Sequence, residues 1–375
     1  MTRVLHIAHG HVKDDIRIVQ KECMSLYRNG YEVYYATLDK EDGRRAPEGI
    51  HFVPIHEENK SFLVNYVINQ NLLNEYCVVI ERIKPEIVHI HEYGISFLVD
   101  IIKKSYPQIK VIYDVHEDNM FFNYERDMEK YGKAAAYVVA HLRGYKEHIA
   151  CKKADVVVSA TPHLKKLLCK YTRNISVIRN YPIVRSNSVK GNAGKDNICC
   201  YVGGVTKERG ITDLIKISSQ IEGKLYIAGP VRDNYLRQLE NRYFDTFNAK
   251  WFYEGFLNRN EVHELYSKSS VGVCLLKPTE NYYHSLPIKL FEYMEAGLPV
   301  VVSDFPVWRE IVEGAQCGYC VDEENLDEIR EKINYLFNHP EEAQAMGENG
   351  RRAVLEKYNW GVEEKKLLQI YRELL

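Results

Sequence analysis

The sequence lacks any run of about 18 apolar residues, the minimum length of a membrane-spanning helix. Met1-Thr2-Arg3 leads directly into an apolar stretch, so no signal peptide is indicated. An excess of one charge is also missing, because the formal net charge is −2 and 27% of the 375 residues are charged. We therefore expect a cytoplasmic protein that binds no nucleic acid. A small positive excess in the N-terminal half favours contact with an anionic membrane at its inner face, although so small an asymmetry usually arises by chance.

Disulfides and metal sites find little support in the sequence. The nine cysteines are odd in number and lie in apolar surroundings, as reduced and mostly buried thiols do. Cys317 and Cys320 have the spacing of a redox or zinc pair, but no second pair and no nearby histidine completes a metal site. Buried thiols are the simpler interpretation.

Apolar strands alternate with helical stretches along the whole chain, the pattern of a parallel sheet covered on both faces. The length suits two domains of roughly 180 residues each. The polar segment Arg185 to Asn197 interrupts the alternation and predicts a linker. We expect an N-terminal domain over 1–182, a linker over 183–197, a C-terminal domain over 198–358 and a terminal helix over 359–375. The predicted strands are Val4–Ala8, Glu32–Thr37, Ile87–Ile90, Lys110–Val115, Ala154–Ser159, Ser176–Ile178, Cys199–Val202, Lys224–Ala228, Val271–Leu276, a strand around Val300–Val302 and Tyr319–Val321.

The segment from His284 to Asp304 predicts a short helix that leads into a strand. Ser285 is suited to cap the helix, Pro287 to occupy its first turn, and Gly297 to end it.

Lys289 and Glu292 lie three residues apart and therefore on nearly one face of this helix. The amides at the helix start and Lys289 could bind a diphosphate, and the Glu292 carboxylate could accept two hydrogen bonds from a ribose diol. An ordinary surface helix with both side chains in solvent explains the spacing equally well.

A second candidate for phosphate binding is the Gly203-Gly204 turn between a predicted strand and a predicted helix. Glycine lets the backbone approach a phosphate closely, and Arg209 at the helix entrance could neutralise it. Most Gly-Gly turns are only turns, so the pattern is weak by itself.

The chain resembles retaining GT-B glycosyltransferases of family 4 over nearly its whole length. Glu292 matches the second Glu of that family's Glu-x7-Glu motif, His284 stands at the position of the first, and Gly204 stands where the family usually has Arg. The Pro-x-Lys-Leu-x-Glu-Tyr-Met sequence from Pro287 matches one branch of the family, in which Lys289 corresponds to the phosphate cation. The resemblance implies a GT-B fold, that is, two Rossmann-like, doubly wound α/β domains facing across a cleft, with a C-terminal helix that crosses back to the N-terminal domain. It places the donor at Gly203, Gly204, Arg209, His284, Ser285, Lys289 and Glu292.

His116 and Glu117 follow a predicted strand, at the edge where open α/β sheets bind ligands. His116 resembles the family's histidine that faces the donor sugar, so we expect His116 and Glu292 as catalytic residues and Glu117 on the acceptor side. A histidine bonded only to a neighbouring loop is the alternative.

Asp15 and Arg17, in the loop after the first strand, resemble the same branch of the family and predict contacts with the acceptor or the diphosphate. An intramolecular ion pair at a helix start explains them almost as well.

His89 and His91 alternate along a predicted strand and therefore share one face. A metal site is one interpretation and an ordinary strand of the family is the other. The Asp-x-Asp triplet, the metal signature of the other major glycosyltransferase fold, does not occur.

By resemblance, we expect a glycosyltransferase that needs no cofactor and no metal. It would move a sugar from a nucleoside diphosphate sugar to a glycan or a lipid-linked acceptor in surface polysaccharide biosynthesis. A nucleotide-sugar epimerase of the same fold and a catalytically weak sugar-nucleotide-binding subunit are the alternatives.

Overall fold

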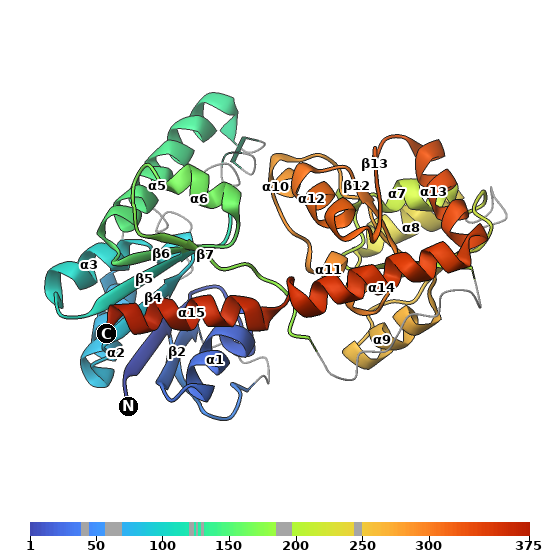
Figure 1. The fold of residues 1–375 in the computed structure, drawn as a ribbon. Coiled ribbons are helices and arrows are strands. Elements are labelled where there is room, and N and C mark those ends of the chain that lie inside the picture. The colour runs from blue at the N-terminus through green and yellow to red at the C-terminus, as the bar shows by residue number, and fades with distance from the viewer. Residues whose placement is uncertain are drawn as a thin grey trace. The chain divides into compact units, whose positions relative to one another are not determined.

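The computed structural model divides the chain into two compact units (Figure 1). Unit 1 comprises Met1–Asn180 and Gly361–Leu375, and unit 2 comprises Tyr181–Trp360. The structure describes residues 1–38, 45–56, 70–119, 124, 127–128, 131–184, 197–243 and 250–375. Most of the predicted linker therefore lies outside the described residues. In the parts of the chain that are described, no helix combines the length and apolar character needed to cross a membrane.

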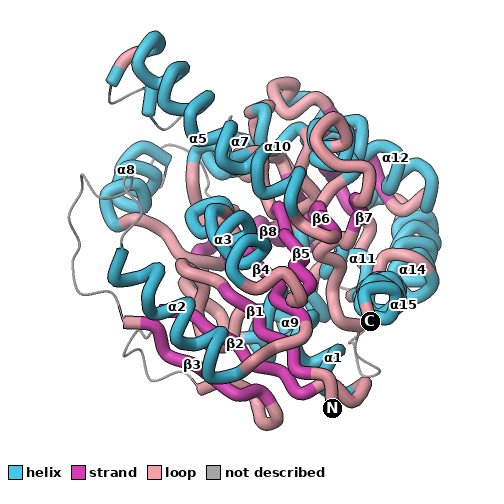
Figure 2. The backbone as a smooth tube through the Cα atoms, turned by 90° about the vertical axis from the view of Figure 1, so that its left-hand side faces the viewer, coloured by secondary structure: helices cyan, strands magenta, loops and turns pink. Residues whose placement is uncertain are grey.

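Unit 1 is built on a seven-stranded parallel sheet of order β3-β2-β1-β4-β5-β6-β7, whose first strands lie side by side in Figure 2. The sheet is buried on both faces, as doubly wound sheets are. Its strands are β1 (Arg3–Ile7), β2 (Glu32–Leu38), β3 (Ile50–Ile55), β4 (Ile87–His91), β5 (Lys110–Val115), β6 (Val156–Ser159) and β7 (Ile175–Val177).

The helices of unit 1 include one of the π type, which follows the first strand. The last helix of the chain also belongs to this unit, because residues 361–375 pack with residues 1–180. These helices are η1 (π, Ile16–Cys23), α1 (Met24–Arg28), α2 (Gln70–Ile83), η2 (Tyr93–Ile95), α3 (Phe97–Ser105), α5 (Lys133–Lys153), α6 (Pro162–Leu168) and α15 (Trp360–Leu374).

Unit 2 repeats the design with a six-stranded parallel sheet of order β10-β9-β8-β11-β12-β13. Its strands are β8 (Ile198–Val202), β9 (Lys224–Ala228), β10 (Trp251–Tyr253), β11 (Val271–Cys274), β12 (Val300–Ser303) and β13 (Gly318–Val321). Its helices are η3 (Lys207–Arg209), α7 (Ile211–Ile217), α8 (Asp233–Tyr243), α9 (Arg259–Lys268), α10 (Glu280–Tyr283), α11 (Ile288–Glu295), α12 (Pro306–Ala315), α13 (Leu326–Asn338) and α14 (Pro340–Glu356).

Alternation along the strands assigns each side chain of unit 1 to one of two layers. Leu5, Val88 and Val111 belong to the apolar core on one face of the sheet. Their neighbours in sequence point to the opposite face, which carries polar side chains near the centre of the sheet. These are His6 on β1, His89 and His91 on β4, and Asp114 on β5.

The strand order reverses between β1 and β4 in unit 1 and between β8 and β11 in unit 2. In open α/β sheets, ligands bind at the carboxyl ends of the strands beside such a reversal. The fold therefore offers one candidate binding crevice in each unit.

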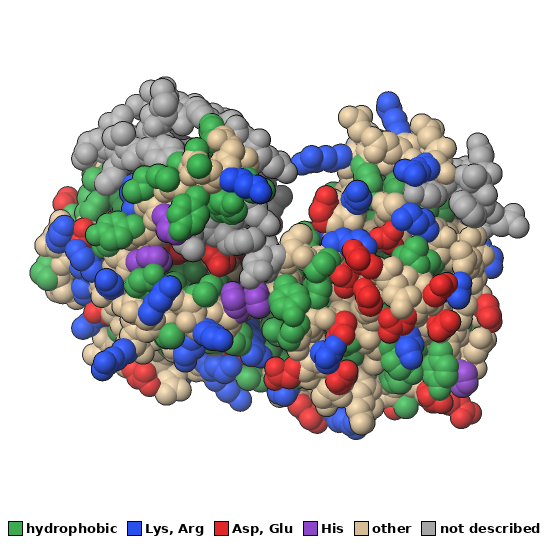
Figure 3. All heavy atoms as spheres, turned by 90° about the horizontal axis from the view of Figure 1, so that it is seen from above, with side chains coloured by type: hydrophobic (Ala, Val, Ile, Leu, Met, Phe, Trp, Pro, Cys, Tyr) green, Lys and Arg blue, Asp and Glu red, His purple; other side chains and the backbone are tan. Residues whose placement is uncertain are grey.

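Surface charge differs between the units in the view from above (Figure 3). Lys and Arg side chains are prominent on unit 1, and Asp and Glu side chains gather on unit 2. This agrees with the small charge asymmetry of the sequence.

Candidate active site

In unit 2, β8 and β11 separate near their carboxyl ends, where the candidate binding crevice lies. Their pairing ends at Gly272 and Cys200, and the Tyr293 hydroxyl takes over beyond that point. Val202 N donates to Tyr293 Oη at 2.9 Å, and Tyr293 Oη donates to Val273 O at 3.3 Å. A Cβ at Gly272 would lie 2.5 Å from the Tyr293 ring, so glycine is needed to admit this ring. Tyr293, on α11, thus holds the two strands apart where the crevice opens.

The helix that begins at Ile288 differs in its cap from the sequence prediction. Pro287 is the N-cap and not a first-turn residue, and no side chain caps the helix. The Ser285 hydroxyl donates to Tyr282 O at 3.2 Å, and the backbone carbonyl of Ser285 accepts from the Trp308 indole. The prediction of a Ser285 cap was wrong because a hydrogen bond to the preceding helical turn competes for the hydroxyl.

Lys289 is the most unusual residue of the crevice. Its side chain is buried, its ammonium has no hydrogen-bond partner, and Nζ lies 3.8 Å from the centroid of the Tyr201 ring. Burial lowers the pKa of Lys289 to about 8, with the nearby Arg209 as a further cause in the same direction. An unpaired, buried cation costs free energy, which an anionic ligand would recover.

The Gly203-Gly204 turn adjoins this ammonium. Gly203 has a φ of +141°, and a Cβ there would lie 2.6 Å from Lys289 Nζ. A Cβ at Gly204 would lie 3.4 Å from Arg209 Nη1. The structure therefore brings together Gly203, Gly204, Arg209 and Lys289, as the sequence predicted.

Glu292 lies one turn further along α11 and accepts from the Tyr266 hydroxyl at 3.4 Å. Burial raises the pKa of Glu292 above its ordinary value. His284 ends α10, with its ring edge-on to Tyr283 at 5.1 Å between centroids. Donor contacts of Glu292, His284 and Ser285 stay predictions.

Tyr201 was not predicted as a site residue. Its ring lies under the Lys289 ammonium, and its hydroxyl donates to Gly204 O at 2.8 Å. Its place two residues before Gly203 was the available signal, but the many dispersed tyrosines obscured it.

In unit 1, Asp114 is the centre of the candidate site. It is fully buried and accepts from Arg17 Nη2 at 3.0 and 3.1 Å and from His116 Nε2 at 2.8 Å. Although burial opposes its charge, the Arg17 guanidinium and His116 hold the pKa of Asp114 well below its usual range. The alternative in which His116 bonds only to a neighbouring loop is wrong for this histidine, since its partner is the strand residue Asp114.

A second cluster of charged side chains surrounds His11, in the loop after β1. His11 Nδ1 lies 2.8 Å from Asp15, and His11 Nε2 lies 2.7 Å from Glu92. Burial opposes protonation of His11, but the hydrogen bonds to Asp15 and Glu92 outweigh it and raise the pKa to about 10. Asp15 also caps η1, because it accepts from the amides of Arg17 and Ile18 at 2.9 Å each.

Glu92 sits in a strained backbone conformation, with a φ of +76°. Such conformations cost about 1–3 kcal/mol and cluster at functional sites. Glu92 follows β4 directly and was not predicted as a site residue.

The predicted acceptor-side residues differ in their surroundings. Asp15 and Arg17 bond to groups of the chain itself, as the ion-pair alternative expected, although the carboxylate partner of Arg17 is Asp114. Glu117 is exposed, and its backbone carbonyl accepts from Asn119 Nδ2. Acceptor contacts of all three stay predictions.

Two groups of described residues have metal-ligating atoms within 4.8 Å of one another. The first is fully buried and partly hydrogen-bonded: His6 Nδ1 lies 2.9 Å from His91 Nε2, and His89 Nδ1 lies 2.8 Å from Tyr371 Oη, while His89 Nε2, His91 Nδ1 and the Glu22 oxygens have no hydrogen-bond partner among the described residues. The second group shares Asp114 with the Arg17 guanidinium. A network of hydrogen-bonded imidazoles accounts for these contacts, so we assign no metal centre. The groups are His6, Glu22, His89 and His91, and His91, Asp114 and His116.

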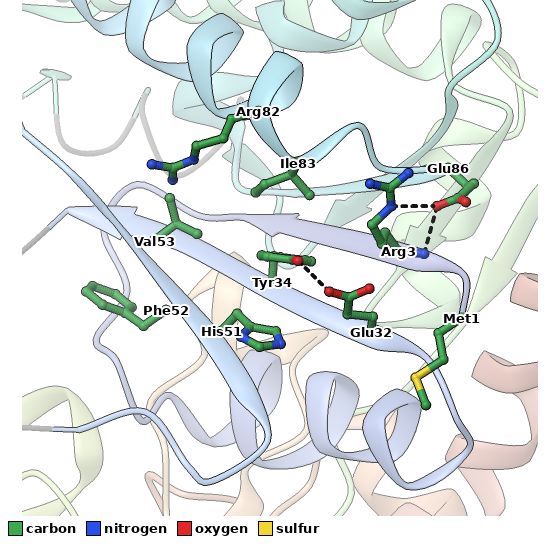
Figure 4. A pocket seen from close by; sticks show the side chains of 10 residues that line it. All are labelled: Met1, Arg3, Glu32, Tyr34, His51, Phe52, Val53, Arg82, Ile83 and Glu86. Carbon is green, nitrogen blue, oxygen red and sulfur yellow. Dashed lines mark hydrogen bonds and ion pairs between the residues drawn. The ribbon is translucent and has the colours of Figure 1, made fainter.

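A pocket of unit 1 lies elsewhere. It has a volume of about 500 Å³ and opens at the amino ends of β1 and β2, where Arg3 and Glu32 line it (Figure 4). This edge of the sheet is opposite to the one where α/β folds bind their ligands. We therefore do not assign the active site there.

Two Rossmann-like domains in one chain are the architecture of the GT-B class. Solved structures support this class. Sucrose-phosphate synthase from Thermosynechococcus elongatus superposes with a TM-score of 0.78 at 14% identity, covering 100% of this chain and 99% of the other. Anabaena HepE in complex with UDP and glucose gives 0.72 at 11% identity and covers 100% of both chains.

The sequence comparisons then give the family of the second domain. Residues 185–353 match the family model of glycosyl transferases group 1. Spore coat protein SA of Bacillus subtilis (strain 168) is 23% identical over 352 residues, which is 88% of this chain and 86% of that protein. With these similarities the chain is a glycosyltransferase, as predicted, and the solved structures confirm the predicted GT-B fold.

Proposed function

We propose that the chain is a metal-independent, retaining glycosyltransferase of family 4 that uses a nucleoside diphosphate sugar as donor. The buried, unpaired ammonium of Lys289 beside Gly203 is the observation that best supports this proposal. In this proposal, Lys289, Arg209 and the amides at the start of α11 bind the donor diphosphate. They stabilise the negative charge that develops on the leaving phosphate, so no metal ion is required for that purpose.

Glu292 would accept hydrogen bonds from the ribose diol. Its position one helical turn after Lys289 suits the distance between a diphosphate and its ribose. His284 and Ser285, which precede α11, would contact the sugar or the diphosphate.

His116 would hold the transferred sugar through a hydroxyl. The acceptor hydroxyl would attack from the face of the leaving group and give its proton to a departing phosphate oxygen, which keeps the configuration of the sugar. Asp15, Arg17 and Glu117 would lie on the side of the acceptor.

The acceptor would be a glycan or a lipid-linked saccharide in surface polysaccharide biosynthesis, and a lipid-linked acceptor would bring the enzyme to the inner face of the membrane. The resemblance to the branch with the Pro-x-Lys-Leu-x-Glu-Tyr-Met motif supports this setting. The prominence of basic side chains on unit 1 is compatible with an anionic membrane surface.

The donor is testable without knowledge of the acceptor. Thermal unfolding with a panel of UDP, GDP, ADP and dTDP and their sugars should single out one nucleotide, because a ligand that binds the folded state raises the Tm. The preferred nucleoside diphosphate should bind about tenfold or more tightly than its 2′-deoxy form, and Glu292→Leu should abolish that preference. Glu264→Leu, on the surface of α9, is the matched control. A preference that survives in Glu292→Leu would refute the ribose assignment.

Release of free nucleoside diphosphate only with an acceptor would separate transfer from its alternatives. Interconversion of the donor sugar without any acceptor would indicate an epimerase instead. Binding of the donor without turnover on any acceptor would indicate a binding subunit.

A further inference from the structure

The Asp114 carboxylate contacts three other side chains of the unit 1 site. The sequence predicts Asp114 only as part of a strand, whereas its carboxylate lies 2.8 Å from His116 and within 3.4 Å of Arg17 and His91. Glu22 approaches the same nitrogen of the Arg17 guanidinium, with Oε1 3.3 Å from Nε. One guanidinium thus serves two buried carboxyl groups.

The two carboxyl groups divide the charge unequally. Burial and the Asp114 charge raise the pKa of Glu22 well above its usual value, while the pKa of Asp114 is held low. Asp114, which accepts the hydrogen bonds of the Arg17 guanidinium, therefore carries the negative charge. An ionised carboxylate has only lone pairs, so each group within hydrogen-bond distance must donate to it.

This condition fixes the tautomer of His116. Its Nε2 faces Asp114 and must carry the proton, so Nδ1 of the neutral ring is the acceptor nitrogen. We propose that Asp114 is a positioning residue, which holds His116 in the tautomer whose Nδ1 accepts a hydrogen bond from a hydroxyl of the sugar substrate. This inference rests on the proposed function of His116.

The requirement that groups beside the Asp114 carboxylate donate to it also fixes the tautomers of the buried histidines of the sheet. His91 Nδ1 faces Asp114 at 3.4 Å and must also carry the proton, because a lone pair there would face the negative charge. His91 Nε2 then accepts from His6 Nδ1, and His6 Nε2 accepts from the Tyr371 hydroxyl.

The chain of donors ends at His89. Because Tyr371 donates to His6, its oxygen accepts from His89 Nδ1, which leaves His89 Nε2 as a lone pair. This agrees with the structure, in which His89 Nε2 is buried without a hydrogen-bond partner. One charge on Asp114 therefore orders the whole network from His116 to α15.

The proposal is tested first by the tautomer itself. In protein labelled with 15N-histidine, long-range 1H–15N correlation spectra distinguish Nε2–H from Nδ1–H rings, and the His116 signals are identified by their loss in His116→Ala. The wild type should show the Nε2–H ring, and Asp114→Asn should populate the Nδ1–H ring. A wild-type Nδ1–H ring would overturn the proposal whether or not Asp114→Asn folds.

Asp155→Asn is the matched control for Asp114→Asn. Asp155 bonds Lys103 Nζ at 2.9 Å and Val111 N at 2.7 Å at the amino ends of β5 and β6. Asp155→Asn also removes a carboxylate that is bonded to a cation, yet it should leave the His116 signals unchanged. A change as large as that in Asp114→Asn would indicate a general structural effect and overturn the proposal.

Kinetics of nucleoside diphosphate release supply the second test. His116→Ala and Asp114→Asn should each lower kcat by about 10²-fold, the cost of a misplaced reacting group, with KM for the donor nearly unchanged. In the His116→Ala background, Asp114→Asn should lower kcat by no more than about twofold, because the two residues act as one unit. Full additivity would overturn the positioning role.

The two tests separate the inference from the proposed function. If His116→Ala retained wild-type kcat, the role of His116 in the reaction would fail, while the tautomer spectra would still decide whether Asp114 fixes the ring. If His116→Ala lost activity but the tautomer were independent of Asp114, only the positioning inference would fail.

Discussion

Lys289 in unit 2 and Arg17 in unit 1 are both buried cations at a switch point, but only Arg17 has a carboxylate partner. Arg17 donates three hydrogen bonds to Asp114, whereas the Lys289 ammonium has no hydrogen-bond partner. Burial opposes both charges. The Asp114 charge nonetheless raises the pKa of Arg17, while the pKa of Lys289 falls to about 8.

The difference separates two kinds of functional site. A charge that is satisfied within the protein fixes the shape of its surroundings, and Arg17 does this for the histidine network. A charge without a partner destabilises the free protein and is relieved by a ligand, as we propose for Lys289 and a diphosphate. The predictions below test this contrast.

Replacement of Arg17 should have the largest effect on stability. Arg17→Met leaves the Asp114 charge buried and uncompensated, which should lower the free energy of unfolding by about 3–5 kcal/mol in urea titrations. Arg309→Met, which removes an exposed arginine paired with Asp304, is the control and should change it by about 0.5 kcal/mol or less. If Arg17→Met lowered the free energy of unfolding as little as Arg309→Met, the Arg17–Asp114 pair would not stabilise the fold.

Replacement of Lys289 should separate stability from binding. Lys289→Met should weaken binding of the preferred nucleoside diphosphate by roughly 10²-fold, about 3 kcal/mol, because charge-assisted hydrogen bonds are lost. The same substitution should raise the free energy of unfolding of the free protein by about 1 kcal/mol, because an unpaired buried charge disappears. Calorimetry and urea titration measure the two effects.

Lys216→Met is the matched control for Lys289, because Lys216 pairs with Asp213 and is partly exposed. It should change neither quantity appreciably. Lys289→Met that binds as well as the wild type would contradict the donor assignment.

Tyr371→Phe should test the network from the side of α15. The variant removes the hydroxyl that serves His6 and His89, so two buried nitrogens lose a partner and the free energy of unfolding should fall by about 1–3 kcal/mol. Tyr335→Phe, whose hydroxyl bonds Glu342 at the surface, should lower it by about 0.5 kcal/mol or less. Equal losses in the two variants would argue against a buried network.

The His11 contacts should give the smallest effect, visible as a pH dependence. Because the folded-state pKa of His11 is raised from 6.5 to about 10, its stabilising contribution is complete below pH 6.5 and is lost as the pH rises towards 10. The difference in unfolding free energy between the wild type and His11→Gln should therefore shrink by about 1 kcal/mol over this range. A difference that stays constant over this range would contradict the raised pKa of His11.

Much of the fold could be predicted from the sequence. The predicted bounds of β5 and β9 agree with the structure, because their apolar runs are flanked by clear turn residues. Strands β3 and β10 were missed, since β3 alternates polar residues and contains Pro54, and β10 has only three residues. Each lies at an edge of its sheet, where burial imposes a weaker pattern.

The sites were predictable only in part. Gly203, Arg209 and Lys289 follow family motifs and lie near one another in the structure, while their donor contacts stay predictions. His89 and His91 share a face as the strand period requires. The network around Asp114 depends on register, because His6 pairs with His89 and His91 with Asp114 across strands distant in sequence. No local pattern encodes that register, and the sequence therefore gave no reason to connect His116 with Tyr371.

The pH dependence of nucleotide binding tests the central claim most directly. A nucleoside diphosphate needs the protonated form of Lys289, whose pKa in the free protein is about 8. Calorimetric titration of the preferred nucleoside diphosphate should therefore show affinity falling roughly tenfold between about pH 7 and about pH 9 in the wild type, and no such fall in Lys289→Met. An equal fall in both proteins, or none in the wild type, would contradict the assignment of Lys289 as the diphosphate cation.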